Sequence, residues 1–85
     1  MTVKVGDICD GIVIRAEYYG LFVEVDGVPG LLRAADLASH YIEHPTDVAN
    51  VGDRIRFQVL QVKDPKASPN EQFNGSIRAL TLNDN

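Results

Sequence analysis

Short runs of β-branched and aromatic residues, separated by glycine and proline, constrain the fold of this chain more than any other feature. In residues 51–64, Ile55, Phe57 and Val59 alternate with polar residues. A period of two places successive side chains on opposite faces, which is typical of a strand with one buried face. After Val59 the apolar residues change phase, which indicates a bend or coil in the strand. This segment is therefore predicted to be a strand.

Four further segments are predicted to be strands: residues 7–19, 20–25, 30–33 and 77–82. The first is rich in isoleucine and valine, and Gly11 within it indicates a bend or bulge. Between the second and third, Asp26-Gly27 suits a tight hairpin turn. The chain thus contains five candidate strands.

The remaining segments are predicted to be connections. Residues 34–50 lose the period of two. Their first four residues fit one helical turn, and His44-Pro45 ends any longer helix. Residues 65–76 are polar, contain two prolines and are predicted to form a loop. Five strands with a connector between the third and fourth fit one closed antiparallel barrel, which also pairs the edges of a small sheet.

Length and composition limit the classes of function. With 85 residues, we expect residues 1–85 to form a single domain. A net charge of −4 argues against gripping duplex DNA by bulk charge, although a local basic patch suffices for weak binding to single strands. The single cysteine, Cys9, excludes an internal disulfide and favours a reducing compartment, so we expect a cytoplasmic protein. No apolar run approaches the roughly 20 residues of a membrane span.

No arrangement of residues typical of catalysis or metal binding stands out. The glycines form no phosphate-binding motif, and no Ser-His-Asp or Cys-His set is evident. His40 and His44 are four residues apart, but Pro45 disfavours the helix that would bring them together, so a surface loop is the simpler interpretation. We therefore expect no enzyme activity and no cofactor.

Aromatic residues are concentrated at one place in the chain. Of six phenylalanine and tyrosine residues, three fall within positions 18–22. The aliphatic residues of 20–25 share one face of their strand, so Phe22 faces the solvent side. A bulge at Gly20 would turn Tyr19 to the same side.

Arg33 adds a cation to this surface, because it faces outward from the strand beside Phe22. Nucleobases stack on exposed rings for about 1–3 kcal/mol each, and a guanidinium pairs with phosphate. Three alternatives stay open. The connector or loop covers Phe22, Tyr19 belongs to the core with its hydroxyl exposed, or Arg33 is simply solvated.

The order of these motifs resembles the S1-type RNA-binding domain, a five-stranded oligonucleotide-binding (OB-fold) barrel. The matching stretches are Val5-Gly6-Asp7, Gly11, Tyr19-Gly20-Leu21-Phe22-Val23, Gly30 to Leu37, Val51-Gly52-Asp53 and Asp64. The resemblance spans nearly the whole chain. It implies a module that binds single-stranded RNA, and we expect low sequence specificity because stacking discriminates weakly among bases.

The resemblance also implies which residues contact RNA: Tyr19, Phe22, Arg33, Asp64 and Arg78. Arg33 stands where the family has a histidine, so a ring is replaced by a permanent cation. Ala35 and Asp36 replace the usual serine and glutamate. Arg78 is aligned to an arginine of strand five, although the longer loop before it allows two alignments.

Several partners and roles remain open from the sequence. Arg54, Arg56 and Lys63 either extend a phosphate track or are solvated or paired with acids such as Asp53. The same barrel would also serve as a protein-interaction module that docks on a ribosomal, polymerase or nuclease partner, or as a structural spacer. We expect a monomer without membrane contact.

Overall fold

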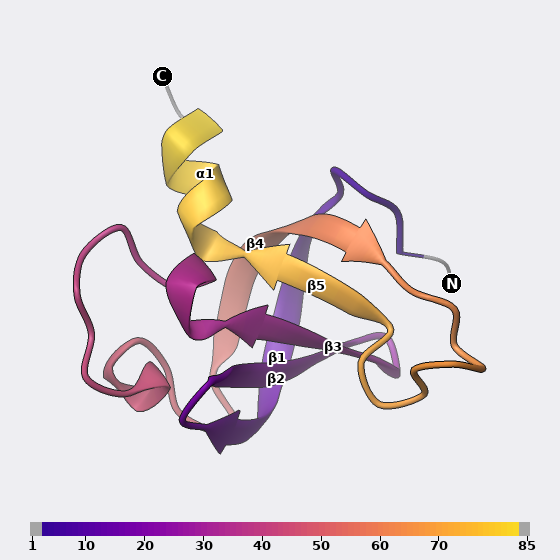
Figure 1. The fold of residues 1–85 in the computed structure, drawn as a ribbon, viewed down its shortest axis with the longest axis horizontal. Coiled ribbons are helices and arrows are strands. Elements are labelled where there is room, and N and C mark those ends of the chain that lie inside the picture. Colours follow the sequence, from indigo (N-terminus) through magenta and orange to yellow (C-terminus); the bar gives the residue numbers. More distant parts are fainter. Residues whose placement is uncertain (1–2, 84–85) are drawn as a thin grey trace.

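The computed structural model describes residues 3–83 and contains five strands that close into a barrel (Figure 1). The strands are β1 (Ile8–Glu17), β2 (Gly20–Val25), β3 (Val28–Arg33), β4 (Arg54–Val62) and β5 (Phe73–Ser76). The other elements are two 3₁₀ turns, η1 (Ala34–Asp36) and η2 (Pro45–Asp47), and the helix α1 (Ile77–Asn83). The all-β OB-type barrel and the helical turn in the connector are thus confirmed. No helix among residues 3–83 is long and apolar enough to cross a membrane.

Strand order around the barrel is β1-β2-β3-β5-β4, with β4 pairing back to β1. All pairs are antiparallel except β3 with β5, which are parallel at Leu31 and Asn74. The fully antiparallel barrel expected from the sequence is therefore corrected at this one pair. The connector after β3 carries the chain to the far side of β1, so β5 returns in the same direction as β3.

Two copies of one turn introduce β1 and β4. Gly6 and Gly52 both have positive φ, +92° and +96°, which glycine tolerates without strain. In each copy the aspartate that follows accepts a backbone N–H three residues earlier, at 3.0 Å and 2.9 Å. The turns then bond to opposite strands, Gly6 N–H to Val59 of β4 and Gly52 N–H to Val13 of β1. The two Val-Gly-Asp motifs thus fix where β1 and β4 begin to pair.

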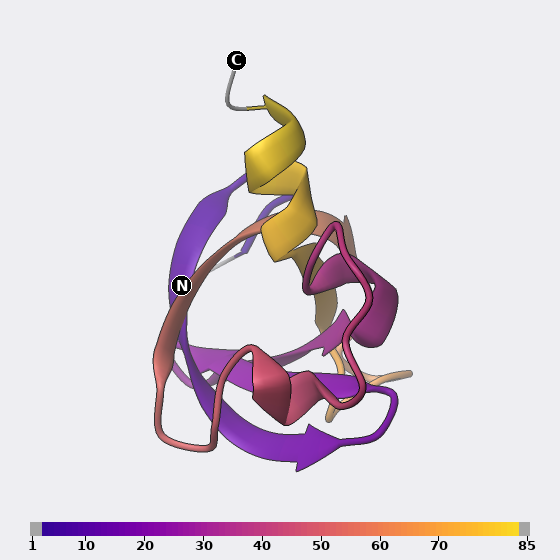
Figure 2. The ribbon, with the colours of Figure 1, turned by 90° about the vertical axis from the view of Figure 1, so that its left-hand side faces the viewer.

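The barrel core is built around two stacked phenylalanines. The rings of Phe57 and Phe73 are fully buried, with centroids 5.7 Å apart and planes 10° from parallel. A Cβ on Gly30 would lie 2.3 Å from the Phe73 ring, so this position has room only for glycine. The connector closes one end of the barrel, because Leu37 and Ala49 are part of the core (Figure 2).

The fifth strand differs from the prediction. Residues 73–76, expected in a loop, form β5, and residues 77–82, expected as the strand, lie in α1. The Phe73 ring is fully buried against Phe57, and this burial favours a strand for residues 73–76 inside the barrel wall. The helix follows directly because the Ser76 hydroxyl accepts the Ala79 backbone N–H at 2.9 Å, as an N-cap does.

Candidate nucleic-acid interface

Tyr19 and Phe22 come together at the outer face of the β1–β2 hairpin. Tyr18 and Tyr19 form the two-residue connection, since Glu17 pairs with Gly20. The Tyr19 ring meets the Phe22 ring edge-on, with centroids 6.0 Å apart and planes at 90°. Tyr19 is 39% exposed and Phe22 is half-buried, so neither ring belongs to the core.

Arg15 completes this cluster and was missed from the sequence. Its guanidinium carbon lies 4.3 Å from the centroid of the Phe22 ring, and a guanidinium N–H donates to the Tyr19 hydroxyl at 3.3 Å. Glu17 forms an ion pair with its Nε at 3.0 Å. Three contacts thus orient one exposed cation. We call Arg15, Tyr19 and Phe22 the aromatic platform.

The bulge that shapes the platform lies in β1, whereas a bulge at Gly20 was expected from the sequence. The register with β2 shifts between Val13 and Arg15, so Ile14 and Arg15 are both exposed. This shift places Arg15 opposite Phe22. Gly20 is needed for a different reason, because a Cβ there would lie 2.3 Å from the Leu32 carbonyl oxygen.

Arg33 lies beside the platform. It pairs with Gly20 across β2 and β3, and the following residue, Ala34, donates its N–H to the Tyr19 carbonyl at 2.8 Å. Arg33 is exposed. The structure therefore places Phe22 of β2, Arg33 of β3 and Tyr19 of the β1–β2 turn near one another.

A hollow of about 290 Å³ adjoins the platform. Its lining comes from the β1 bulge, β2, β3 and the loop between β4 and β5: Ile14, Arg15, Phe22, Pro29 and Asn70. A larger hollow of about 620 Å³ lies among residues 37–48 of the connector, and none of the predicted site residues lines it.

Two other predicted contact residues have different surroundings. Asp64 is the second residue of the β4–β5 loop, where its carboxylate accepts the Lys66 backbone N–H at 2.9 Å. Arg78 is exposed on α1 and not on a strand, which corrects its alignment to a strand-five arginine. Because α1 starts directly after Ser76, Arg78 leaves the sheet at the end of β5.

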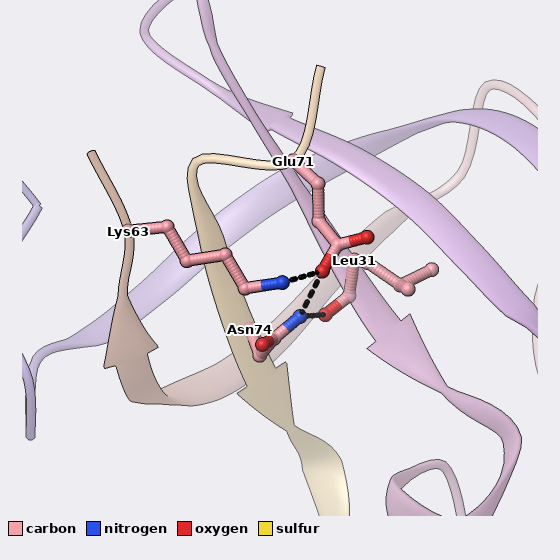
Figure 3. Close-up of polar contacts among 4 residues, drawn as sticks. All are labelled: Leu31, Lys63, Glu71 and Asn74. Carbon is pink, nitrogen blue, oxygen red and sulfur yellow. Dashed lines mark hydrogen bonds and ion pairs between the residues drawn. The ribbon is translucent and has the colours of Figure 1, made fainter. Parts of the chain in front are cut away.

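Lys63 is held by a carboxylate at the base of the β4–β5 loop. Its ammonium group bonds to Glu71, and the same carboxylate oxygen accepts from the Asn74 amide at 3.1 Å (Figure 3). Asn74 is buried and also reaches the Leu31 carbonyl at 3.5 Å. Burial raises the pKa of Glu71, but the hydrogen bonds from Lys63 and Asn74 and the charges of Lys63 and Arg33 lower it more. The pKa of Glu71 therefore lies below its usual value, and its carboxylate is ionised at neutral pH.

Arg56 is likewise paired. It faces Asp10 across β4 and β1, and two guanidinium nitrogens lie 3.1 Å and 3.3 Å from the carboxylate oxygens. The hydrogen bond from Arg56 lowers the pKa of Asp10 below its usual value. Arg54 is exposed on the same strand, opposite Ile12 of β1. Two of the three cations of the predicted phosphate track therefore hold carboxylates.

The structure also accounts for His44 and Cys9. The His44 ring accepts the Thr46 backbone N–H at 3.1 Å and caps η2. Cys9 is half-buried against the core, and burial followed by the nearby aspartates raises the pKa of its thiol. Within residues 3–83, no three His, Cys, Asp or Glu side chains are placed to share a metal ion.

Comparison with known proteins gives consistent matches. The family model described as S1 RNA binding domain matches residues 2–70. The chain is 36% identical to 4-hydroxy-3-methylbut-2-enyl diphosphate reductase of Clostridium acetobutylicum over 92% of the chain. It is 32% identical to the small ribosomal subunit protein bS1 homolog of Bacillus subtilis over 91% of the chain. It spans only 12% and 19% of these two relatives.

Solved structures agree on the fold. GSP13 from Bacillus subtilis superposes with a TM-score of 0.80 at 26% identity, covering 94% of this chain and 59% of that protein. A chain in the a/eIF2alpha-aDim2p-rRNA complex from Pyrococcus horikoshii gives a TM-score of 0.82 at 22% identity, covering 98% of this chain and 49% of that chain. At that identity the second match supports the barrel fold alone.

Proposed function

This chain belongs to the S1 RNA-binding domain family, a family of nucleic-acid-binding OB modules, and we propose that it binds single-stranded RNA through the aromatic platform and Arg33. The observation that carries the proposal is the Arg15 guanidinium carbon 4.3 Å from the Phe22 ring centroid, beside the exposed ring of Tyr19. An exposed cation beside aromatic rings on the surface contributes little to the stability of the barrel, so this arrangement favours a binding role.

Stacking is the proposed source of affinity. One base stacks on the Tyr19 ring and another on the guanidinium plane of Arg15, each for about 1–3 kcal/mol. Arg33, next to Tyr19, holds the phosphate between them. Because every base has a flat π-face, this part of the interaction discriminates weakly among sequences.

Electrostatics keep the proposed affinity modest. The chain carries a net charge of −4, and Arg56 and Lys63 are already paired with carboxylates. We therefore propose that Arg54 alone extends the phosphate contacts. Asp64 and Arg78 stay in the proposed site on the strength of the family resemblance.

The relatives support a non-catalytic role in RNA binding. Several curated relatives are named small ribosomal subunit protein bS1, and the relative named as an enzyme matches over only 12% of its length. A ribosomal relative also favours a cytoplasmic location. We propose a monomeric module, because within residues 3–83 each strand of the closed barrel has a neighbouring strand on both sides.

A second candidate function rests on exposed aliphatic side chains. Val5 is 65% exposed and Ile8 is 61% exposed, and Leu60 of β4 is also open to solvent. These residues would serve docking on a protein partner in translation or RNA metabolism. Salt separates the two functions, because phosphate binding weakens as salt rises and an apolar protein contact is much less sensitive.

The experiment that tests the RNA-binding proposal is an NMR titration of the ¹⁵N-labelled domain with a short single-stranded RNA at low and then moderate salt. We expect the largest shifts at the amides of Tyr19, Phe22 and Arg33, fading as salt rises. An absence of shifts at low salt would reject RNA binding, and the exposed aliphatic side chains would become the surface to test next.

A further inference from the structure

We propose that the hollow beside Phe22 holds one unstacked nucleobase and that the Asn70 side chain reads the edge of that base. This inference rests on the proposed RNA binding and adds a base preference to it. It assigns a role to a residue of the β4–β5 loop that neither the sequence analysis nor the family resemblance included.

The walls of the hollow suit a flat ring. Ile14 and Pro29 are apolar and come from β1 and β3, and the Phe22 ring lies between them on β2. Ile14 is 43% exposed because the bulge in β1 turns it outward. Apolar side chains on both sides would cover the two faces of a base. They would offer no hydrogen-bond donor to a phosphate, which would lose its hydration there.

The polar groups of the hollow suit the edge of a base. Asn70 carries an amide donor and a carbonyl acceptor side by side, which matches the neighbouring donors and acceptors on a base edge. Arg15 lines the same hollow from β1, where the Tyr19 hydroxyl and Glu17 hold its guanidinium as a fixed polar rim beside the base. A purely apolar ligand would leave the Asn70 amide without a partner in the hollow.

Asn70 is held in place by bonds on both sides of it. Gln72 donates its N–H to the Pro29 carbonyl at 2.9 Å and its side-chain amide to the Pro69 carbonyl at 3.1 Å. Glu71, the next residue, is fixed by Lys63 and Asn74 (Figure 3). A loop anchored in this way loses little backbone freedom on binding, which favours selective recognition. Lys63 and Glu71 are thus positioning residues for Asn70.

The test compares eight-nucleotide oligo(A), oligo(C) and oligo(U) by fluorescence anisotropy at one salt concentration, for the whole chain and for Asn70→Ala. We expect the unaltered domain to bind the best oligonucleotide at least about five-fold more tightly than the weakest, the low end for a bidentate base contact. In Asn70→Ala we expect this spread to fall below about two-fold, with binding of the weakest oligonucleotide unchanged.

A matched control is Asn50→Ala, which removes an exposed asparagine from the turn before β4 and should keep the spread. An equal affinity of the unaltered domain for all three oligonucleotides, or a spread that survives Asn70→Ala, would overturn the base pocket and leave RNA binding standing. A failure of the unaltered domain to bind any of them at low salt would instead reject RNA binding itself.

Discussion

Arg15 and Phe22 face each other across the β1–β2 hairpin, with the guanidinium carbon 4.3 Å from the ring centroid. The Arg15 side chain is 58% exposed, so this contact stabilises the fold by only about 0.5–1 kcal/mol. Its larger consequence is positional, because the hydrogen bond to Tyr19 and the ion pair with Glu17 hold the guanidinium over the Phe22 ring.

We expect Arg15→Ala and Arg15→Lys to separate stacking from charge. Arg15→Ala removes both and should weaken RNA binding by about 1–3 kcal/mol, and the slope of the logarithm of the association constant against log salt should become less negative by about 0.7. Arg15→Lys keeps the charge, so the salt slope should stay while the stacking part of the affinity is lost. Anisotropy titrations at several salt concentrations measure both quantities, and unchanged affinity in Arg15→Ala would remove Arg15 from the site.

Replacing Tyr19 tests whether its ring serves binding or the fold. Tyr19→Ala should weaken RNA binding by about 1–3 kcal/mol and change the free energy of unfolding by less than about 1 kcal/mol, because the ring lies outside the core. Tyr19→Phe keeps the ring and should retain most of the affinity. The measurements are anisotropy for binding and urea denaturation for stability. A large loss of stability in Tyr19→Ala would mean that the ring is part of the packing.

Gly30→Ala should destabilise the barrel, because its Cβ would lie 2.3 Å from the buried Phe73 ring. Overpacking of this kind costs typically about 1–3 kcal/mol, measured as a lower urea midpoint. Phe73→Leu frees space at the same place, so the double variant should be more stable than the sum of the single effects predicts. Strict additivity of the two changes would contradict the close contact.

The parity of apolar residues predicted the strands well where one face is buried along the whole segment. In β4, Phe57 and Val59 are buried and Arg54 and Arg56 are exposed, as the alternation requires. The hairpin at Asp26-Gly27 is also confirmed, with positive φ of 49° and 84°. Local signals suffice there because side-chain direction and turn chemistry are set by adjacent residues.

Predictions failed where distant strands decide the structure. The four residues of β5 include the polar residues Asn74 and Ser76, which are typical of a loop. Both are nevertheless buried, because β5 pairs with β3 and β4. Arg15 was missed for a similar reason, since only the register shift after Val13 places it opposite Phe22. Neither pairing leaves a periodic signal in the segment itself.

Glu71 should make the stability of the domain depend on acidic pH. Its pKa in the folded state lies below the ordinary value of 4.5, because the bonds from Lys63 and Asn74 and the nearby charges outweigh the effect of burial. The unfolded chain therefore takes up the proton more readily than the folded one. The ion pair contributes its full stability above the unfolded pKa, and this contribution is lost as pH falls through the folded pKa.

We expect Glu71→Gln to lower the free energy of unfolding at pH 7 by about 1 kcal/mol, the range of a partly exposed charged contact. The difference between this variant and the unaltered domain should then shrink as pH falls from 4.5 toward the lower pKa of the folded state, because the unfolded chain takes up the proton first. Urea denaturation at a series of pH values measures the difference. Glu24→Gln, which removes an exposed carboxylate from β2, controls for net charge. A difference that stays constant down to pH 3 would show that Glu71 acts through packing and not through its charge.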